Sequence, residues 1–300
     1  MGQYLESAII DNICWVCGSN NLELAKKSNI NKELTSSDFR ITDKLYGITA
    51  EIHHCRDCDF LQCSDMKEIL TFYENLEDSA YEEGRSQRSI QAKKILDILL
   101  RFKSTGKLLD IGAGSGILVE QAIIKNYDAE GIEPSNWLQN TAKNLQIPVH
   151  LGTFPNSKAV GPYDAVTIID VLEHVPNPVG LLKEVRKILS KEGVGMVSTP
   201  DVKSLIARLF GWKWWHFRVA HVGYFNEDTL LKILDNAGLK TIGLFRPSWY
   251  FPADYIFDRL KNYIPLLSRF HSPNFLKKIT IPLNLRDQML VLFVKKETES

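Results

Sequence analysis

Four cysteines with paired spacing are the first residues in the chain whose types suggest chemistry. They form two C-x-x-C pairs, Cys14 with Cys17 and Cys55 with Cys58. Two such turns supply four thiolates, the number that a tetrahedral structural zinc site uses. Because four protein ligands leave no coordination position open for a substrate, we expect a structural Zn2+ here and catalysis elsewhere in the chain.

Other interpretations of the cysteines remain open. Cys63 has no partner at this spacing, so it is either a spare thiol or a substitute ligand, and His53 and His54 are competing ligands. Unliganded buried thiols, disulfides and a redox-active C-x-x-C are the remaining alternatives. The first residues carry neither the basic segment nor the apolar run of a secretory signal. We therefore expect a cytoplasmic protein with reduced thiols.

A glycine-rich turn is the second group of residues suited to chemistry. It reads Gly-Ala-Gly-Ser-Gly over 112–116, after a buried strand expected at 107–111 and before a helix expected at 117–125. Glycines let the backbone approach a ligand, and the start of the helix offers free amides. The next expected strand ends at Glu133, a carboxylate placed to bind two ribose hydroxyls.

The residues around this turn distinguish between two classes of cofactor. The third glycine of a dinucleotide-binding fingerprint would fall at Ile117, so that fingerprint fails. Asp110, two residues before the first glycine, would repel a pyrophosphate but attract an ammonium group. S-adenosyl-L-methionine carries an α-amino group and a ribose but no phosphate, so the turn favours S-adenosyl-L-methionine over NAD. A purely structural turn is the alternative.

These segments resemble class I S-adenosyl-L-methionine-dependent methyltransferases. Leu108–Gly116 is similar to their first motif, and Tyr163–Val175 to their fourth strand and the loop after it. Residues 179–200 resemble the following helix and fifth strand, and His221–Asn226 a later segment of the same subgroup. The resemblance spans about residues 85–245. It implies an α/β fold with a Rossmann-like, doubly wound seven-stranded sheet, here preceded by a small N-terminal zinc ribbon.

The same resemblance implies which residues form the site. The residues expected to bind the cofactor are Asp110, Gly112, Ala113, Gly114, Gly116, Glu133, Asp170 and Leu172. The catalytic candidates are Glu173, His174 and His221, because transfer to oxygen removes a proton from the acceptor and histidine titrates in a suitable range. A structural role for His174, a divalent metal on Asp170, Glu173 and His174, and catalysis by proximity alone remain as alternatives.

The predicted organisation has three parts: a zinc-ribbon-like module at 1–66, a helical linker at 67–105, and a methyltransferase domain at 106–300. An insertion is expected at about 247–285, in a region where residues 201–300 carry fifteen Lys and Arg against nine Asp and Glu. We interpret it as a lid over the acceptor or a helix that contacts a membrane surface, with a solvated helix as the alternative. The aromatic segment 212–217 is expected to cover the acceptor pocket or to pack on the core.

Composition limits the class of partner. The 300 residues include 36 Lys and Arg and 36 Asp and Glu, and this neutral balance argues against a nucleic-acid partner. The paired C-x-x-C module is similar to that of bacterial members of this subgroup, and this resemblance implies a role in sugar or cell-surface polysaccharide modification. We therefore expect methyl transfer to a small-molecule or carbohydrate acceptor, at oxygen, in polysaccharide biosynthesis. A quinol-type O-methyltransferase, an RNA methyltransferase that uses the zinc ribbon, and a non-catalytic scaffold that binds S-adenosyl-L-methionine are the alternatives.

Overall fold

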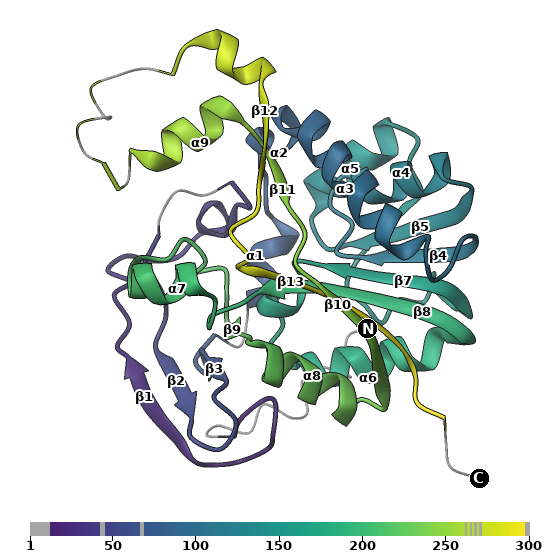
Figure 1. The fold of residues 1–300 in the computed structure, drawn as a ribbon, viewed down its shortest axis with the longest axis horizontal. Helices are drawn as coiled ribbons and strands as arrows, with labels where there is room; N and C mark the ends of the chain where they lie inside the picture. The colour runs from purple at the N-terminus through teal and green to yellow at the C-terminus, as the bar shows by residue number, and fades with distance from the viewer. Residues whose placement is uncertain are drawn as a thin grey trace.

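Seven strands form the central sheet in a computed structural model that describes residues 13–42, 46–66, 69–261, 263, 264, 266, 269 and 272–297 (Figure 1). Their order is β10 (Leu239–Phe245), β13 (Gln288–Lys295), β8 (Leu189–Pro200), β7 (Tyr163–Ile169), β4 (Gly106–Ile111), β5 (Tyr127–Glu133) and β6 (Val149–Leu151). Neighbours from β8 to β6 are parallel, whereas β13 is antiparallel to both β8 and β10. This sheet confirms the predicted Rossmann-like fold.

Helices cover both faces of the sheet (Figure 1). One face carries α3 (Arg85–Leu99), α4 (Ile117–Ile124) and α5 (Asn136–Asn144), and the other carries α6 (Pro178–Ile188) and α8 (Glu227–Asn236). Each helix buries one apolar stripe; α6 buries Leu181, Leu182 and Val185. The two layers produce two apolar cores, one on each side of the sheet.

A smaller, four-stranded sheet contains the cysteine-bearing part of the chain. Its order is β1 (Leu22–Lys26), β2 (Ile52–Cys55), β3 (Leu61–Gln62) and β9 (Gly223–Tyr224), with every pair antiparallel. β9 belongs to the connection between β8 and α8, so the two parts of the chain share this sheet. Ahead of β2, Gly47 turns the chain with a φ of +77° and donates its amide proton to the Phe217 carbonyl.

Shorter elements connect the two sheets and form the insertion. The connecting helices are α1 (Ile69–Glu74), α2 (Ser79–Glu83) and α7 (Leu205–Phe210), with 3-10 helices η1 (Ser36–Phe39), η2 (Leu172–His174) and η3 (Gly211–Lys213). Between β10 and β13 lie β11 (Trp249–Pro252), α9 (Ala253–Leu260), the 3-10 helix η5 (Asn274–Lys278) and β12 (Thr280–Leu283), and β11 pairs with β12. In the described part of the chain, no helix combines the length and apolar character that a membrane span requires.

The division at residues 66 and 105 stays a prediction. Residues 1–12, 43–45, 67, 68 and 298–300 lie outside the described residues, as do six positions within the insertion. Across the first boundary, Cys14 and Cys55 pack in the same apolar core as Val166 of β7 and Ile233 of α8. The N-terminal module is therefore packed directly on the methyltransferase-like sheet.

Candidate active site

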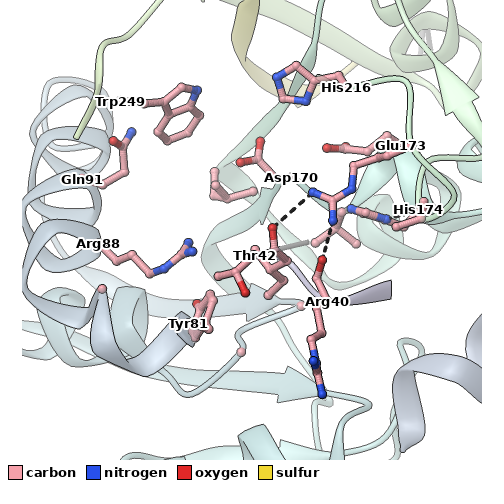
Figure 2. Close-up of a pocket in the computed structure, with 18 of the residues that line it drawn as sticks. Arg40, Thr42, Tyr81, Arg88, Gln91, Asp170, Glu173, His174, His216 and Trp249 are labelled. Carbon is pink, nitrogen blue, oxygen red and sulfur yellow. Dashed lines mark hydrogen bonds between the residues drawn. The ribbon is translucent and has the colours of Figure 1, made fainter. Parts of the chain in front are cut away.

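A cavity of about 1340 Å3 opens at the carboxyl ends of β4, β5 and β7. Its walls also include α3, the segment 40–42 of the N-terminal module, and α9 of the insertion. Figure 2 shows Arg88 and Gln91 facing Asp170, Glu173 and His174 across this space. Because the strand ends of a parallel sheet meet at one edge, residues from distant parts of the chain line one cavity.

The glycine turn forms one wall of the cavity. The amides of Gly112 and Ala113 both donate to the Ile132 carbonyl at 2.9 Å, which fixes the turn against β5. Gly114 has a φ of +55°, and a Cβ there would lie 2.8 Å from the hydroxyl oxygen of Tyr81. Gly116 begins α4 and faces Ile147 instead of the cavity. The first three of these positions are therefore the ones that leave room for a ligand.

Two buried carboxyl groups flank this turn. Glu133 accepts hydrogen bonds from the amides of Gly114 and Ser135, each at 2.8 Å, and Asp110 accepts one from the Thr167 hydroxyl at 2.7 Å. Burial raises the pKa of both carboxyl groups to about 7. A ligand that brings a positive charge and hydroxyl donors would favour their ionised forms.

Asp170 and Leu172 follow β7, but they face different surroundings. Asp170 lines the cavity, exchanges hydrogen bonds with the Ser198 hydroxyl, and has a pKa raised to about 6 by burial. Leu172, the first residue of η2, is fully buried in the apolar core that α6 and α8 also form, and it does not line the cavity. Val171 lines the cavity beside Asp170 instead.

Arg88 is a cavity residue that the sequence motifs did not identify. Its guanidinium carbon lies 4.0 Å from the centre of the Tyr81 ring, and Tyr81 in turn contacts the glycine turn at Gly114. Figure 2 shows Arg88 extending from α3 toward the cavity beside Tyr81. A guanidinium beside this turn suits a carboxylate. The available signal was helical spacing, because Arg88, Gln91 and Ile95 recur on one side of α3 and line the cavity.

His174 is held in one tautomer on the opposite wall. Its Nδ1 lies 2.7 Å from the Ala220 carbonyl, which only accepts, so this nitrogen carries the proton. Tyr73 adds a hydroxyl contact at 2.6 Å to the same nitrogen. No hydrogen bond to Nε2 is formed among the described residues, so its lone pair is available. Burial lowers the pKa of His174 to about 4, which keeps the imidazole neutral.

Glu173 and His221 lie beside this histidine. Glu173 accepts a hydrogen bond from the Thr199 hydroxyl at 3.0 Å, and burial near Asp170 raises its pKa. The rings of His221 and His174 meet edge to face at 4.8 Å. The ligand atoms of Glu173, His174 and His221 lie within 4.8 Å of one another, a grouping that could hold a metal ion. Asp170, which the sequence placed in such a set, lies outside this grouping.

Some residues of the aromatic segment 212–217 line the cavity and others pack in the core, the two alternatives expected from the sequence. Trp215 and His216 line the cavity, and burial lowers the pKa of His216 to about 3. Trp214 and Phe217 are buried in the core, where the Trp214 indole donates to Asp287 at 3.2 Å. Trp212 is partly exposed at the surface.

The four paired cysteines come together outside the cavity. The sulfur atoms of Cys14 and Cys58 lie 3.5 Å apart, those of Cys17 and Cys55 3.6 Å apart, and all four within 4.8 Å. A hydrogen bond from Cys58 lowers the pKa of the Cys14 thiol to about 5. Cys63 is buried elsewhere and does not belong to this group. The arrangement could hold a metal ion.

A family model described as a methyltransferase domain matches residues 82–244, more than half of the chain. The chain belongs to the methyltransferase domain family. This methyltransferase is 35% identical over 107 residues to a ubiquinone biosynthesis O-methyltransferase of Psychrobacter cryohalolentis, a match that covers 31% of the chain and 40% of that relative. A ubiquinone biosynthesis O-methyltransferase of Acinetobacter baylyi is 26% identical over 185 residues, with 52% of the chain and 76% of the relative covered.

A solved structure supports the same fold. A chain in the complex between a Haloferax volcanii methyltransferase activator and a methyltransferase superposes with a TM-score of 0.51 at 12% identity. The match covers 77% of this chain and 98% of that one. The family match and the fold together identify the protein as an enzyme, a class I S-adenosyl-L-methionine-dependent methyltransferase. The roles of its individual site residues stay predictions.

Replacing Glu133 with glutamine is expected to weaken the binding of S-adenosylhomocysteine by about 10- to 100-fold. A hydrogen bond to a charged group contributes about 1.5–3 kcal/mol, and about 1.4 kcal/mol corresponds to a factor of ten. Isothermal titration calorimetry measures the affinity. Asp128→Asn, an exposed substitution on the same strand, is the control. Equal affinities for Glu133→Gln and the wild type would show that Glu133 does not contact the ribose.

The affinity for S-adenosylhomocysteine is expected to fall as the pH decreases from 8 to 6. Asp110 and Glu133 have pKa values of about 7 before the ligand binds, and the ligand favours their ionised forms, so binding below pH 7 must release protons. For each of these two carboxyl groups, the affinity falls by at most about tenfold per pH unit. Calorimetry at pH 6.5 in buffers of different ionisation enthalpy measures the released protons. A pH-independent affinity would contradict this assignment.

Proposed function

We propose that this methyltransferase transfers the methyl group of S-adenosyl-L-methionine to a phenolic hydroxyl of an aromatic acceptor of the quinol class. The single observation that carries the proposal is a neutral His174 on the cavity wall, with a fixed tautomer and an available Nε2. The names of the curated relatives support an aromatic acceptor, although one match covers only 40% of the relative's length. They give no support to the polysaccharide role expected from the sequence.

The cofactor half of the cavity suits each polar group of S-adenosyl-L-methionine. Glu133 would bind the ribose hydroxyls, Asp110 the ammonium group and Arg88 the carboxylate. Gly152, Thr153 and Phe154 line the cavity beyond Glu133, where the adenine would lie. When bound, S-adenosyl-L-methionine supplies an electrophilic methyl group on its sulfonium sulfur.

The acceptor half supplies a proton acceptor and aromatic walls. His174 Nε2 takes the proton of the acceptor hydroxyl while its Nδ1 proton remains bonded to the Ala220 carbonyl. The hydroxyl oxygen forms the new bond to carbon as the bond from that carbon to sulfur breaks. Phe210, Trp215 and Trp249 line this part of the cavity and offer ring faces to an aromatic acceptor.

The four paired cysteines fit a structural zinc ion. Tetrahedral coordination with Zn–S bonds of about 2.3 Å places neighbouring sulfur atoms about 3.8 Å apart. The observed pairs at 3.5 and 3.6 Å require little movement to reach that spacing.

His174→Asn is expected to lower kcat by about 100- to 10,000-fold toward an alkyl-substituted catechol, the range attributed to a positioned base. Asparagine retains a donor at the place of Nδ1, so the bond to Ala220 survives while the Nε2 lone pair is lost. S-adenosylhomocysteine affinity should remain within about twofold of the wild-type value. His150→Asn, on β6 outside the cavity, is the control.

Two outcomes would contradict this mechanism. An unchanged kcat in His174→Asn would leave proximity as the source of catalysis. Activity that disappears with a chelator and returns with Mg2+ would assign Glu173, His174 and His221 to a metal instead. A parallel assay with sugar nucleotides tests the carbohydrate acceptor.

The surface at the cavity mouth supports an acceptor that resides in a membrane. Residues 202–226 contain four Lys or Arg and residues 259–286 contain six, and neither segment contains Asp or Glu. The segments meet where the Tyr263 hydroxyl donates to the Lys213 carbonyl at 3.0 Å. Leu205 and Leu209 of α7 are 84% and 76% exposed, and Phe275 of η5 is 62% exposed. Cations around exposed apolar side chains suit an anionic lipid surface.

We expect the methyltransferase to sediment with vesicles of mixed phosphatidylcholine and phosphatidylglycerol, and to lose this binding in high salt. Leu209→Glu should reduce the bound fraction at least several-fold, since a carboxylate would enter the apolar contact. Ile124→Glu, an exposed substitution on α4, is the control. Equal binding of both variants, or equal binding to vesicles of phosphatidylcholine alone, would exclude this surface.

A further inference from the structure

We propose that Gln62 is a positioning residue of the active site. Its side chain is anchored on the first cysteine turn, and its backbone holds the segment 220–224 that orients His174 and Glu173. The cysteine module would thereby set the geometry of the acceptor half of the cavity. The effect on turnover rests on the proposed role of His174, whereas the positioning itself does not.

The Gln62 side chain is fully buried and all its polar atoms are bonded. Its Oε1 accepts the amide proton of Trp15 at 2.9 Å, and its Nε2 donates to the Ile13 carbonyl at 3.0 Å. Nε2 also donates to the Ser64 hydroxyl at 3.0 Å. Trp15 lies between Cys14 and Cys17, so this amide binds the backbone of the turn that carries half of the four-cysteine group.

The backbone of the same residue reaches the segment beside the active site. Gln62 pairs with Gly223, and Leu61 with Tyr224, in the antiparallel contact between β3 and β9. The next amide, that of Cys63, donates to the Val222 carbonyl at 2.8 Å. β9 is only two residues long, and β3 is its only strand neighbour in the described sheet.

The segment before β9 contains the catalytic candidate His221 and contacts the other two, Glu173 and His174. The Val222 amide donates to the Glu173 carbonyl at 2.8 Å, and the Ala220 carbonyl accepts the Nδ1 proton of His174 at 2.7 Å. Hydrogen bonds thus continue from Trp15 through Gln62, Cys63 and Val222 to Glu173. A displacement of β3 would move the carbonyl that fixes the His174 tautomer.

The cofactor half has a separate support. Asp110, Gly112 and Glu133 are held by β4, β5 and Thr167. Among the hydrogen bonds of the described residues, none joins 110–116 to β3 or β9. A change at Gln62 should therefore affect methyl transfer and leave cofactor binding unchanged, a separation that general unfolding would not produce.

The test compares Gln62→Met with Gln121→Met, another buried glutamine, located on α4 outside the active site. Methionine fills a similar volume but leaves the Trp15 amide and the Ile13 carbonyl without partners. We expect bound zinc and S-adenosylhomocysteine affinity within twofold of wild type, and kcat for the alkyl catechol at least tenfold lower. Gln121→Met should retain the wild-type kcat.

Hydrogen exchange provides a readout that does not depend on catalysis. In Gln62→Met we expect the Val222 and Cys63 amides to exchange at least tenfold faster, while the Gly112 amide exchanges at the wild-type rate. Gln62→Glu retains the acceptor for Trp15 and should give an intermediate rate if Gln62→Met does not fold. Unchanged exchange in the variant that folds would overturn the positioning, whatever the role of His174. Faster exchange with an unchanged kcat would show that the positioning by Gln62 is not important for catalysis.

Discussion

Burial of four carboxyl groups at one edge of the parallel sheet is the constraint on which the active site depends. Asp110, Glu133, Asp170 and Glu173 come from the ends of β4, β5 and β7 and the turn after β7, and burial raises the pKa of each. Each carboxyl group accepts at least one hydrogen bond. Thr167 donates to Asp110, and the amides of Gly114 and Ser135 donate to Glu133. Ser198 donates to Asp170, and Thr199 donates to Glu173. A ligand with a sulfonium, an ammonium and hydroxyl groups offsets the like-charge repulsion that remains.

The two halves of the cavity are built by different means. The cofactor half uses backbone conformation, because Gly112 and Gly114 adopt positive φ values and a side chain there would clash with Val171 and Tyr81, which line the cavity. The acceptor half uses contacts between distant segments, in which Tyr73, His174 and Ala220 meet in one hydrogen-bonded group. The geometry of the cofactor half therefore depends on the central sheet alone, whereas the geometry of the acceptor half also requires the small sheet to remain in register.

This difference explains how much the sequence could predict. The strand expected at 107–111 matches β4, the next one ends at Glu133 as expected, and the glycine turn lies between β4 and α4, because the rules that predict these features act over a few neighbouring residues. Leu172 was expected near the cofactor, but a 3-10 turn, which spacing does not reveal, buries it in the core. The pairing of Gln62 with Gly223 arises from tertiary packing and leaves no local pattern, whereas helical spacing could have grouped Arg88 with Gln91 and Ile95 but could not have placed it beside Tyr81.

The balance of charge shows why composition constrains function only weakly. The chain has equal numbers of basic and acidic residues, yet they are unevenly distributed: Asp110, Glu133 and Glu173 are buried together at one edge of the sheet, whereas residues 259–286 contain six Lys or Arg and no Asp or Glu. Net charge averages over these regions, whereas a ligand or a lipid surface experiences the local field within about a Debye length.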